Sequence, residues 1–233
     1  MIFDMTFLVL VLPAVFFAVW ANIKVNSTFK RYSALRPVGG MTGAEAARRV
    51  LDANGLYNVR IEHTHGNLSD HFDPRTNVIR LSDSVYGVSS AAAIGVAAHE
   101  AGHAVQYAKG YVLLKLRNAI IPVTNIGSRL AMPLILLGII FSGMGQQFVY
   151  VAYAGIACFA LSTLFQLLTL PTEFNASRRA LVSIESSGLL YGEELEGARK
   201  VLTAAAMTYV AALAVSLMQL LRLLMLVGGG RRR

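Results

Sequence analysis

The chain has 233 residues, of which 55% are hydrophobic, and a formal net charge of +8. Soluble globular proteins are about 45–50% apolar, so this composition and a mean hydropathy of +0.54 indicate a membrane protein. The basic charge does not indicate nucleic-acid binding, because much of it flanks apolar segments and no helix interleaves it with aromatic residues. A single cysteine excludes an intrachain disulfide and a cysteine-based metal cluster.

The first element in chain order is an apolar stretch over residues 5–23. It is long enough for a hydrocarbon core that needs about 20 residues. Asp4 precedes it and Lys24 follows it, whereas a signal peptide would begin with basic residues and end at a small-residue cleavage site. Residues 1–23 are therefore predicted to form a retained transmembrane anchor.

The polar segment that follows, residues 24–118, is predicted to be a small α+β catalytic region. Thr42 and Glu45 match a capping box ahead of a helix that ends near Gly55. Two short strands are expected, over residues 57–62 and 77–81. An alanine-rich helix then starts after a serine cap, at Ser89 or Ser90, and runs to about Lys109.

That helix contains the pattern H-E-x-x-H, formed by His99, Glu100 and His103. Residues four apart share one helix face, so both imidazoles can point at one Zn²⁺ ion. Glu100 stands beside the metal, where it can take a proton from zinc-activated water and pass it to the leaving amine. Gly102 makes the helix thin beside the ligands. A purely structural histidine pair around a buried glutamate would cost desolvation without an evident gain, which favours zinc.

Residues 119–170 are predicted to form a transmembrane helical hairpin, because two apolar stretches, 120–144 and 148–170, are separated by only three residues. Residues 204–233 are predicted to form a C-terminal transmembrane helix, apolar over 204–227, and a basic tail. The expected fold class is a mainly α membrane protein. It has about four transmembrane helices and a small α+β, zincin-like catalytic region that carries the H-E-x-x-H helix.

A catalytic zinc needs a third protein ligand and an open position. The polar segment 171–203 offers Glu173, which follows Pro171 at a point where a new helix would start at the membrane face. Three spans precede this segment, so it falls on the same side as His99 if every span crosses. Glu173 is the preferred third ligand; the alternative is a carboxylate that only stabilises a helix N-terminus.

Two blocks of sequence resemble the neutral zinc metallopeptidase family of bacterial membranes, the YugP-like proteins. The blocks are residues 70–107, DHFDPRTNVIRLSDSVYGVSSAAAIGVAAHEAGHAVQY, and residues 170–180, LPTEFNASRRA. With the span arrangement, the resemblance covers nearly the whole chain. This family looks like a relative of the HtpX and prenyl-protein peptidases, whose third ligand is a glutamate on a later helix.

The resemblance implies His99, His103 and Glu173 as zinc ligands and Glu100 as the general acid/base. In the HtpX-type relatives an aspartate commonly follows the ligand glutamate by four residues. Here that position is Ser177, whose hydroxyl can still hydrogen-bond a ligand.

His71 and Asp73 stand just before the strand predicted over residues 77–81. In many metallopeptidases a strand upstream of the motif pairs with the extended substrate backbone. His71 could then donate a hydrogen bond to the oxyanion; the alternative is a loop histidine beside a turn at Asp73. His63 and His65 are expected to face solvent; the less favoured alternative is a second metal site.

Basic residues flank the segments that carry the zinc motif, and the positive-inside rule places that site on the cytoplasmic side of the cell's inner membrane. These residues are Lys24, Lys30, Arg31, Arg36, Arg178 and Arg179. The terminal arginines Arg231–Arg233 oppose this orientation if the last segment spans.

The sequence therefore predicts a multi-pass membrane zinc metalloendopeptidase that cleaves peptide or protein substrates, in membrane protein quality control. One alternative is an intramembrane site-2-type zinc protease, against which the polar residues of the motif helix argue. The other is a non-catalytic membrane scaffold with a vestigial zinc site, against which the intact Glu100 argues.

Overall fold

A computed structural model describes residues 4–229 and divides the chain into two compact units. The first unit comprises the segment up to Trp20, Leu116–Leu170 and the segment from Thr208 onwards. The second comprises Ala21–Lys115 and Pro171–Met207. The expected basic tail at Arg231–Arg233 lies outside the described residues, as do the first three residues of the expected anchor.

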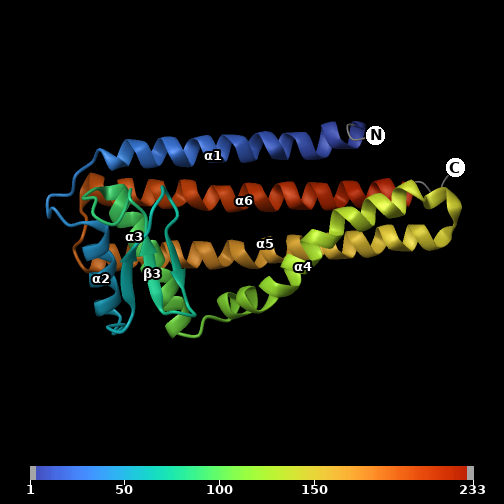
Figure 1. The fold of residues 1–233 in the computed structure, drawn as a ribbon. Helices are drawn as coiled ribbons and strands as arrows, with labels where there is room; N and C mark the ends of the chain where they lie inside the picture. Colours follow the sequence, from blue (N-terminus) through green and yellow to red (C-terminus); the bar gives the residue numbers. More distant parts are fainter. Residues whose placement is uncertain (1–3, 230–233) are drawn as a thin grey trace. The chain divides into compact units, whose positions relative to one another are not determined.

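The fold is mainly α with a small sheet (Figure 1). The helices are α1 (Leu12–Ser33, after a π-helical turn at Phe7–Val11), α2 (Gly43–Ala53), α3 (Ala91–Ala108), α4 (Val112–Ile140), α5 (Gln146–Ser186) and α6 (Gly192–Gly229). A 3₁₀ turn at Ser142–Met144 joins α4 to α5, and the strands are β1 (Arg60–His63), β2 (His71–Asp73) and β3 (Val78–Leu81). Within residues 4–229, four helices are long and apolar enough to cross a membrane: α1 with its preceding turn, α4, α5 and α6. The predicted fold class, a mainly α protein with four candidate spans and a small sheet, is confirmed.

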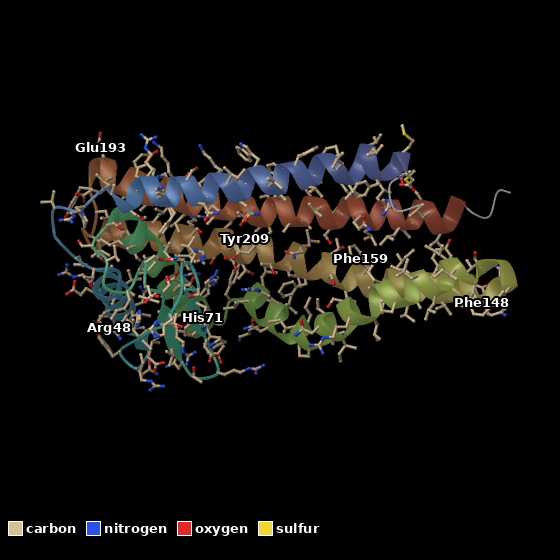
Figure 2. The ribbon with its side chains drawn as sticks, turned by 45° about the horizontal axis from the view of Figure 1, so that its top comes forward. Arg48, His71, Phe148, Phe159, Glu193 and Tyr209 are labelled. Carbon is tan, nitrogen blue, oxygen red and sulfur yellow. The ribbon has the colours of Figure 1, made fainter. Side chains whose placement is uncertain are left out.

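The two units differ in polarity. Figure 2 shows nitrogen and oxygen atoms gathered around Arg48 and His71 of the second unit, whereas the side chains around Phe148 and Phe159 of the first are mostly carbon. Among the described residues, the charged ones in the first unit are Asp4, Arg117, Arg129 and Arg222. Most of the charged residues among those that the structure describes therefore lie in the second unit.

In the first unit, α4 and α5 pack with their backbones close together. A side chain at Gly138 would collide with the backbone of Ala152, and a Cβ at Gly155 would lie 2.7 Å from the backbone nitrogen of Ile135. Small residues of this kind allow close packing between membrane helices. The predicted hairpin stretches thus lie against each other.

An ion pair joins the first and last helical segments of this unit. Arg222 Nε lies 3.3 Å from Asp4 Oδ1, with the two side chains 9% and 22% exposed. The guanidinium also lies over the Phe7 ring, 5.3 Å from its centroid. A charge on an apolar helix is costly unless it is paired, so this contact accounts for Arg222 within an otherwise apolar segment.

The second unit contains the sheet, in the order β1-β3-β2, with β1 parallel and β2 antiparallel to β3. Ile61, Ile79 and Phe72 share the face that packs against the core. The largest fully buried core side chains in this unit include Leu51, Ile79, Leu81, Ile94, Ile184 and Leu190. The sheet and the helices α2 and α3 thus form one layered core.

β3 is the strand expected over residues 77–81, and it occupies the centre of the sheet. Both of its edges are already paired, because β1 and β2 flank it. The expectation that this strand pairs with substrate is therefore wrong. Only the outer strands β1 and β2 have an edge that an added strand could use.

In the second unit, two helices start where the sequence predicted, and a third predicted start is absent. The capping box of Thr42 and Glu45 is present at α2, and Ser90 caps α3 by accepting from Ala93 N. Pro171, however, does not begin a helix, since α5 runs through it to Ser186. A proline inside a helix removes one backbone hydrogen bond, and apolar membrane helices tolerate this where neighbouring groups compensate.

Candidate metal centre

The motif helix α3 is buried along most of its length by small residues. Ala97, Ala98 and Ala101 are fully buried, so α3 sits deep within the second unit. His99 and His103 lie one turn apart, with ring centroids 4.7 Å apart and the rings nearly perpendicular. The two imidazoles therefore converge on one point beside the helix.

Gly102 sets the distance between α3 and α5. A Cβ at this position would lie 2.7 Å from the carbonyl oxygen of Ala176, too close for any side chain. The absence of a side chain at Gly102 thus allows the backbones of α3 and α5 to come into close contact. Glu173 stands one turn before Ala176 on α5, and this contact brings it against the histidines.

The three side chains meet through one carboxylate oxygen. Glu173 Oε2 lies 3.2 Å from His99 Nε2 and 3.5 Å from His103 Nε2. Ligands about 2.0–2.2 Å from a tetrahedral zinc are separated by about 3.3–3.6 Å, which these distances match. Two imidazoles and one carboxylate also form a donor set that is common at catalytic zinc. The residues present therefore fit the ion.

The other ring nitrogens are already held by the protein. Ser177 Oγ lies 3.1 Å from His99 Nδ1, and Gln106 Oε1 lies 3.0 Å from His103 Nδ1. The Gln106 amide nitrogen donates to Thr172 O and Asn175 Oδ1, both at 2.9 Å. Its oxygen must then accept from His103 Nδ1–H, which leaves the lone pair of Nε2 available to a metal ion. Ser177 lies where the sequence analysis expected a ligand partner.

Gln106 is a residue of this site that the sequence patterns did not predict. It is fully buried and stands three residues after His103, on the same face of α3. A buried glutamine one turn past a ligand histidine is a signal, because its amide needs several partners. Its bonds to Thr172 and Asn175 depend on α5, which no local pattern reveals.

Two buried carboxylates, those of Glu100 and Glu173, lie close to the histidines of this site. Burial disfavours a charged ring at His103, but the hydrogen bond that this ring donates to Glu173 and the charges of Glu100 and Glu173 outweigh it and raise the pKa of His103. Glu173 has a side chain only 3% exposed. Glu100 is also buried, yet it is not part of the converging ligand group. Negative charge beside two histidines suits a cation.

His71 is not brought to this cluster. It lies on β2, next to Phe72, whose ring contacts Tyr107 of α3 with centroids 6.0 Å apart. Neighbouring residues of a strand point to opposite faces, so His71 points away from α3. Its Nδ1 lies 2.9 Å from Ser69 O, and the residue is exposed (Figure 2). A role as oxyanion donor stays a prediction.

Comparisons with known proteins agree with this geometry. The family model described as "Putative neutral zinc metallopeptidase" matches residues 7–228. A curated protein of Bacillus subtilis (strain 168), named "Putative membrane protease YugP", is 48% identical over 227 residues, covering 97% of this chain and 99% of that protein. No solved structure matches the chain significantly.

Proposed function

The chain belongs to this family of neutral zinc metallopeptidases, and from that membership we propose that it is a membrane-embedded zinc metalloendopeptidase. Its ligands are His99, His103 and Glu173, and its general acid/base is Glu100. The observation that carries the proposal is the convergence of two Nε2 atoms on Glu173 Oε2, at 3.2 and 3.5 Å, with both Nδ1 atoms held by other partners.

The reaction is the hydrolysis of a peptide bond. Bound zinc supplies Lewis acidity that polarises the scissile carbonyl and activates water. Glu100 takes a proton from the attacking water on its carboxylate and passes it to the leaving amine nitrogen. Gln106 and Ser177 hold the two imidazoles in orientation, so that these groups need not reorganise during the reaction.

The rival proposals are supported less well. An intramembrane site-2-type protease would need its motif helix within lipid, yet α3 is not among the candidate spans of the described residues. A scaffold with a vestigial site would not need Glu100, which is buried next to the ligands without acting as one. Both observations favour a peptidase whose catalytic helix lies outside the hydrocarbon core.

The multi-pass chain is proposed to present this site to the cytoplasm and to act in membrane protein quality control. Support for the orientation comes from charge. Lys24, Lys30 and Arg31 on α1 and Arg178 and Arg179 on α5 all belong to the unit that contains the zinc ligands. Basic residues beside membrane helices mark the cytoplasmic face. A membrane peptidase facing that side would meet misfolded membrane proteins.

The test uses the full chain purified in detergent. Glu100→Gln is expected to keep its zinc but to lose cleavage of an unfolded protein by about 10²–10⁴-fold, the usual contribution of a general acid/base. Glu173→Ala is expected to lose one zinc ion per chain, measured by elemental analysis. Glu185→Gln on α5, an exposed carboxylate outside the cluster, is the control and should retain both properties. Full activity in Glu100→Gln would make the mechanism wrong.

A further inference from the structure

A second group of metal-binding side chains lies elsewhere in the polar unit. His63, His65 and Asp83 each offer one ligand atom, and these atoms lie within 4.8 Å of one another. All three residues are exposed, unlike the partly buried catalytic group. None of them has a part in the proposed peptidase reaction.

The sheet brings these residues together. β1 and β3 are parallel and in register from Arg60 with Val78 to His63 with Leu81, so both strands end at the same edge. Thr64 N donates to Leu81 O at 2.8 Å and extends the pairing by one residue. His63 and His65 are two residues apart, and Asp83 is two residues past the end of β3. Three side chains therefore leave the sheet at one corner.

The carboxylate of Asp83 is held by one oxygen and presents the other. Gly66 N donates to Oδ2 at 2.9 Å, while Oδ1 lies 2.7 Å from His63 Nε2 and 3.8 Å from His65 Nδ1. Gly66 has a φ of +113°, a conformation that glycine adopts without strain and that turns the loop back over Asp83. The backbone therefore orients Oδ1 toward both histidines.

The rings and the neighbouring turn are also held in place. His63 makes edge-to-face contacts with His65 and Tyr86, each at 5.4 Å between centroids. Ser82, next to Asp83, donates from its backbone nitrogen to Asp70 Oδ1 at 2.7 Å. Asp70 ends the loop that follows β1 and contains His65. Both sides of the cluster are thus tied to the same short loop, residues 64–70.

We propose that His63, His65 and Asp83 form a second, exchangeable Zn²⁺ site that fastens the loop 64–70 to the turn after β3. Two imidazoles and a carboxylate suit zinc, and their separations of 2.7 and 3.8 Å lie on either side of the 3.3–3.6 Å or so expected between zinc ligands. Water completes the coordination because the site is exposed. The loop leads into the outer strand β2, so the ion orders the start of that strand.

A simple ion pair between His63 and Asp83 is the competing account, and it requires neither His65 nor a metal. The two accounts differ in what happens when His65 is removed. The site also differs from the catalytic one in that it needs no residue of α3 or α5. Its failure and the failure of the proposed peptidase site are therefore separable.

The experiment measures zinc stoichiometry in the detergent-purified full chain, stripped with a chelator and titrated with Zn²⁺ against a competing chromophoric chelator. The wild type is expected to bind two ions, His99→Ala one, His65→Ala one, and the double variant none. His71→Ala, which removes an exposed histidine of the same sheet outside the cluster, is the matched control and should bind two. Two ions in His65→Ala, or a single ion in the wild type that His99→Ala abolishes, would overturn the proposal.

A second readout locates the ion. Zn²⁺ is expected to slow proteolytic cleavage within residues 64–70 in the wild type and in His99→Ala. Asp83→Asn keeps an oxygen for the Gly66 amide but removes the charge. The Zn²⁺ concentration needed to protect the loop should then rise by more than about 100-fold. That exceeds the usual cost of losing a residue that only hydrogen-bonds to a metal ligand. Protection that survives Asp83→Asn and His65→Ala unchanged would contradict a metal site at this corner.

Discussion

Gln106 connects the proposed ligand His103 to α5 through one buried amide. Its oxygen faces His103 Nδ1, and its nitrogen donates to the backbone of Thr172 and to Asn175. Asn175 Oδ1 also accepts from Arg179 Nε at 2.8 Å, so the chain of hydrogen bonds continues along α5. The orientation of the His103 ring therefore depends on α5, so both helices contribute to the proposed metal site.

Replacing Gln106 with leucine is expected to lower zinc affinity at the catalytic site by about 10–100-fold, the usual cost of losing a partner of a ligand histidine. The reason is that His103 loses the acceptor that fixes its tautomer. Competition with a chelator measures the change. Gln146→Leu at the exposed start of α5 is the control; equal affinities in the two variants would show that Gln106 does not orient the ligand.

The charge of His103 makes zinc binding depend on pH. Zinc and a proton compete for the same nitrogen, and the raised pKa of His103 means that the metal-free ring keeps its proton above the ordinary value of about 6.5. Affinity for zinc should therefore fall as the pH is lowered, and the fall should begin above pH 6.5. Zinc titrations between about pH 5 and 9 test this. Affinity that stays constant down to pH 6.5 would contradict it.

At the scale of helices, the contact between α3 and α5 depends on the absence of a side chain at Gly102. An alanine in a helix is usually better than glycine by about 1 kcal/mol. Here its methyl group would meet the Ala176 carbonyl, and overpacking costs about 1–3 kcal/mol. The steric cost is the larger effect. It would push α5 away from α3 at the contact that positions Glu173.

Gly102→Ala is therefore expected to destabilise the chain by up to about 2 kcal/mol and to lower both zinc content and cleavage. Thermal unfolding in detergent and metal analysis measure the two effects. Gly87→Ala, at a glycine where an added methyl group would meet no atom within 4 Å, is the control and should be neutral. A variant with more stability and full zinc content would mean that α5 moves aside freely.

Some helices, strands and site residues could be predicted from the sequence, and others could not. The capping box, the motif helix and Glu173 follow from local patterns or from a family resemblance, and the structure has the first two as expected. β2 was not predicted, because three residues carry no periodic signal and the strand forms only by pairing with β3. The local preference of Pro171 predicted that a helix would start there, but α5 continues through this proline from Gln146 to Ser186. Gln106 required the position of α5, 66 residues further along the chain.

At the scale of the whole molecule, orientation in the membrane can be tested by thiol labelling. Ser142 precedes α5 and Glu193 follows it, and both are exposed. In a Cys158→Ser background, Ser142→Cys should react with a membrane-impermeant reagent in intact cells, whereas Glu193→Cys should react only after permeabilisation. The reason is that α5 is a candidate span between these two positions and that the proposed orientation places the basic side in the cytoplasm. The reverse pattern would place the zinc site outside.

The ion pair between Asp4 and Arg222 has a consequence for how such chains diverge. The two residues are 218 positions apart, yet each neutralises the charge of the other among apolar helices. Loss of one partner leaves the other charge without its counter-ion, whereas replacing both with apolar residues can be nearly neutral. Descendant sequences are therefore expected to keep both residues or to exchange both, so that these two distant positions accumulate substitutions in concert.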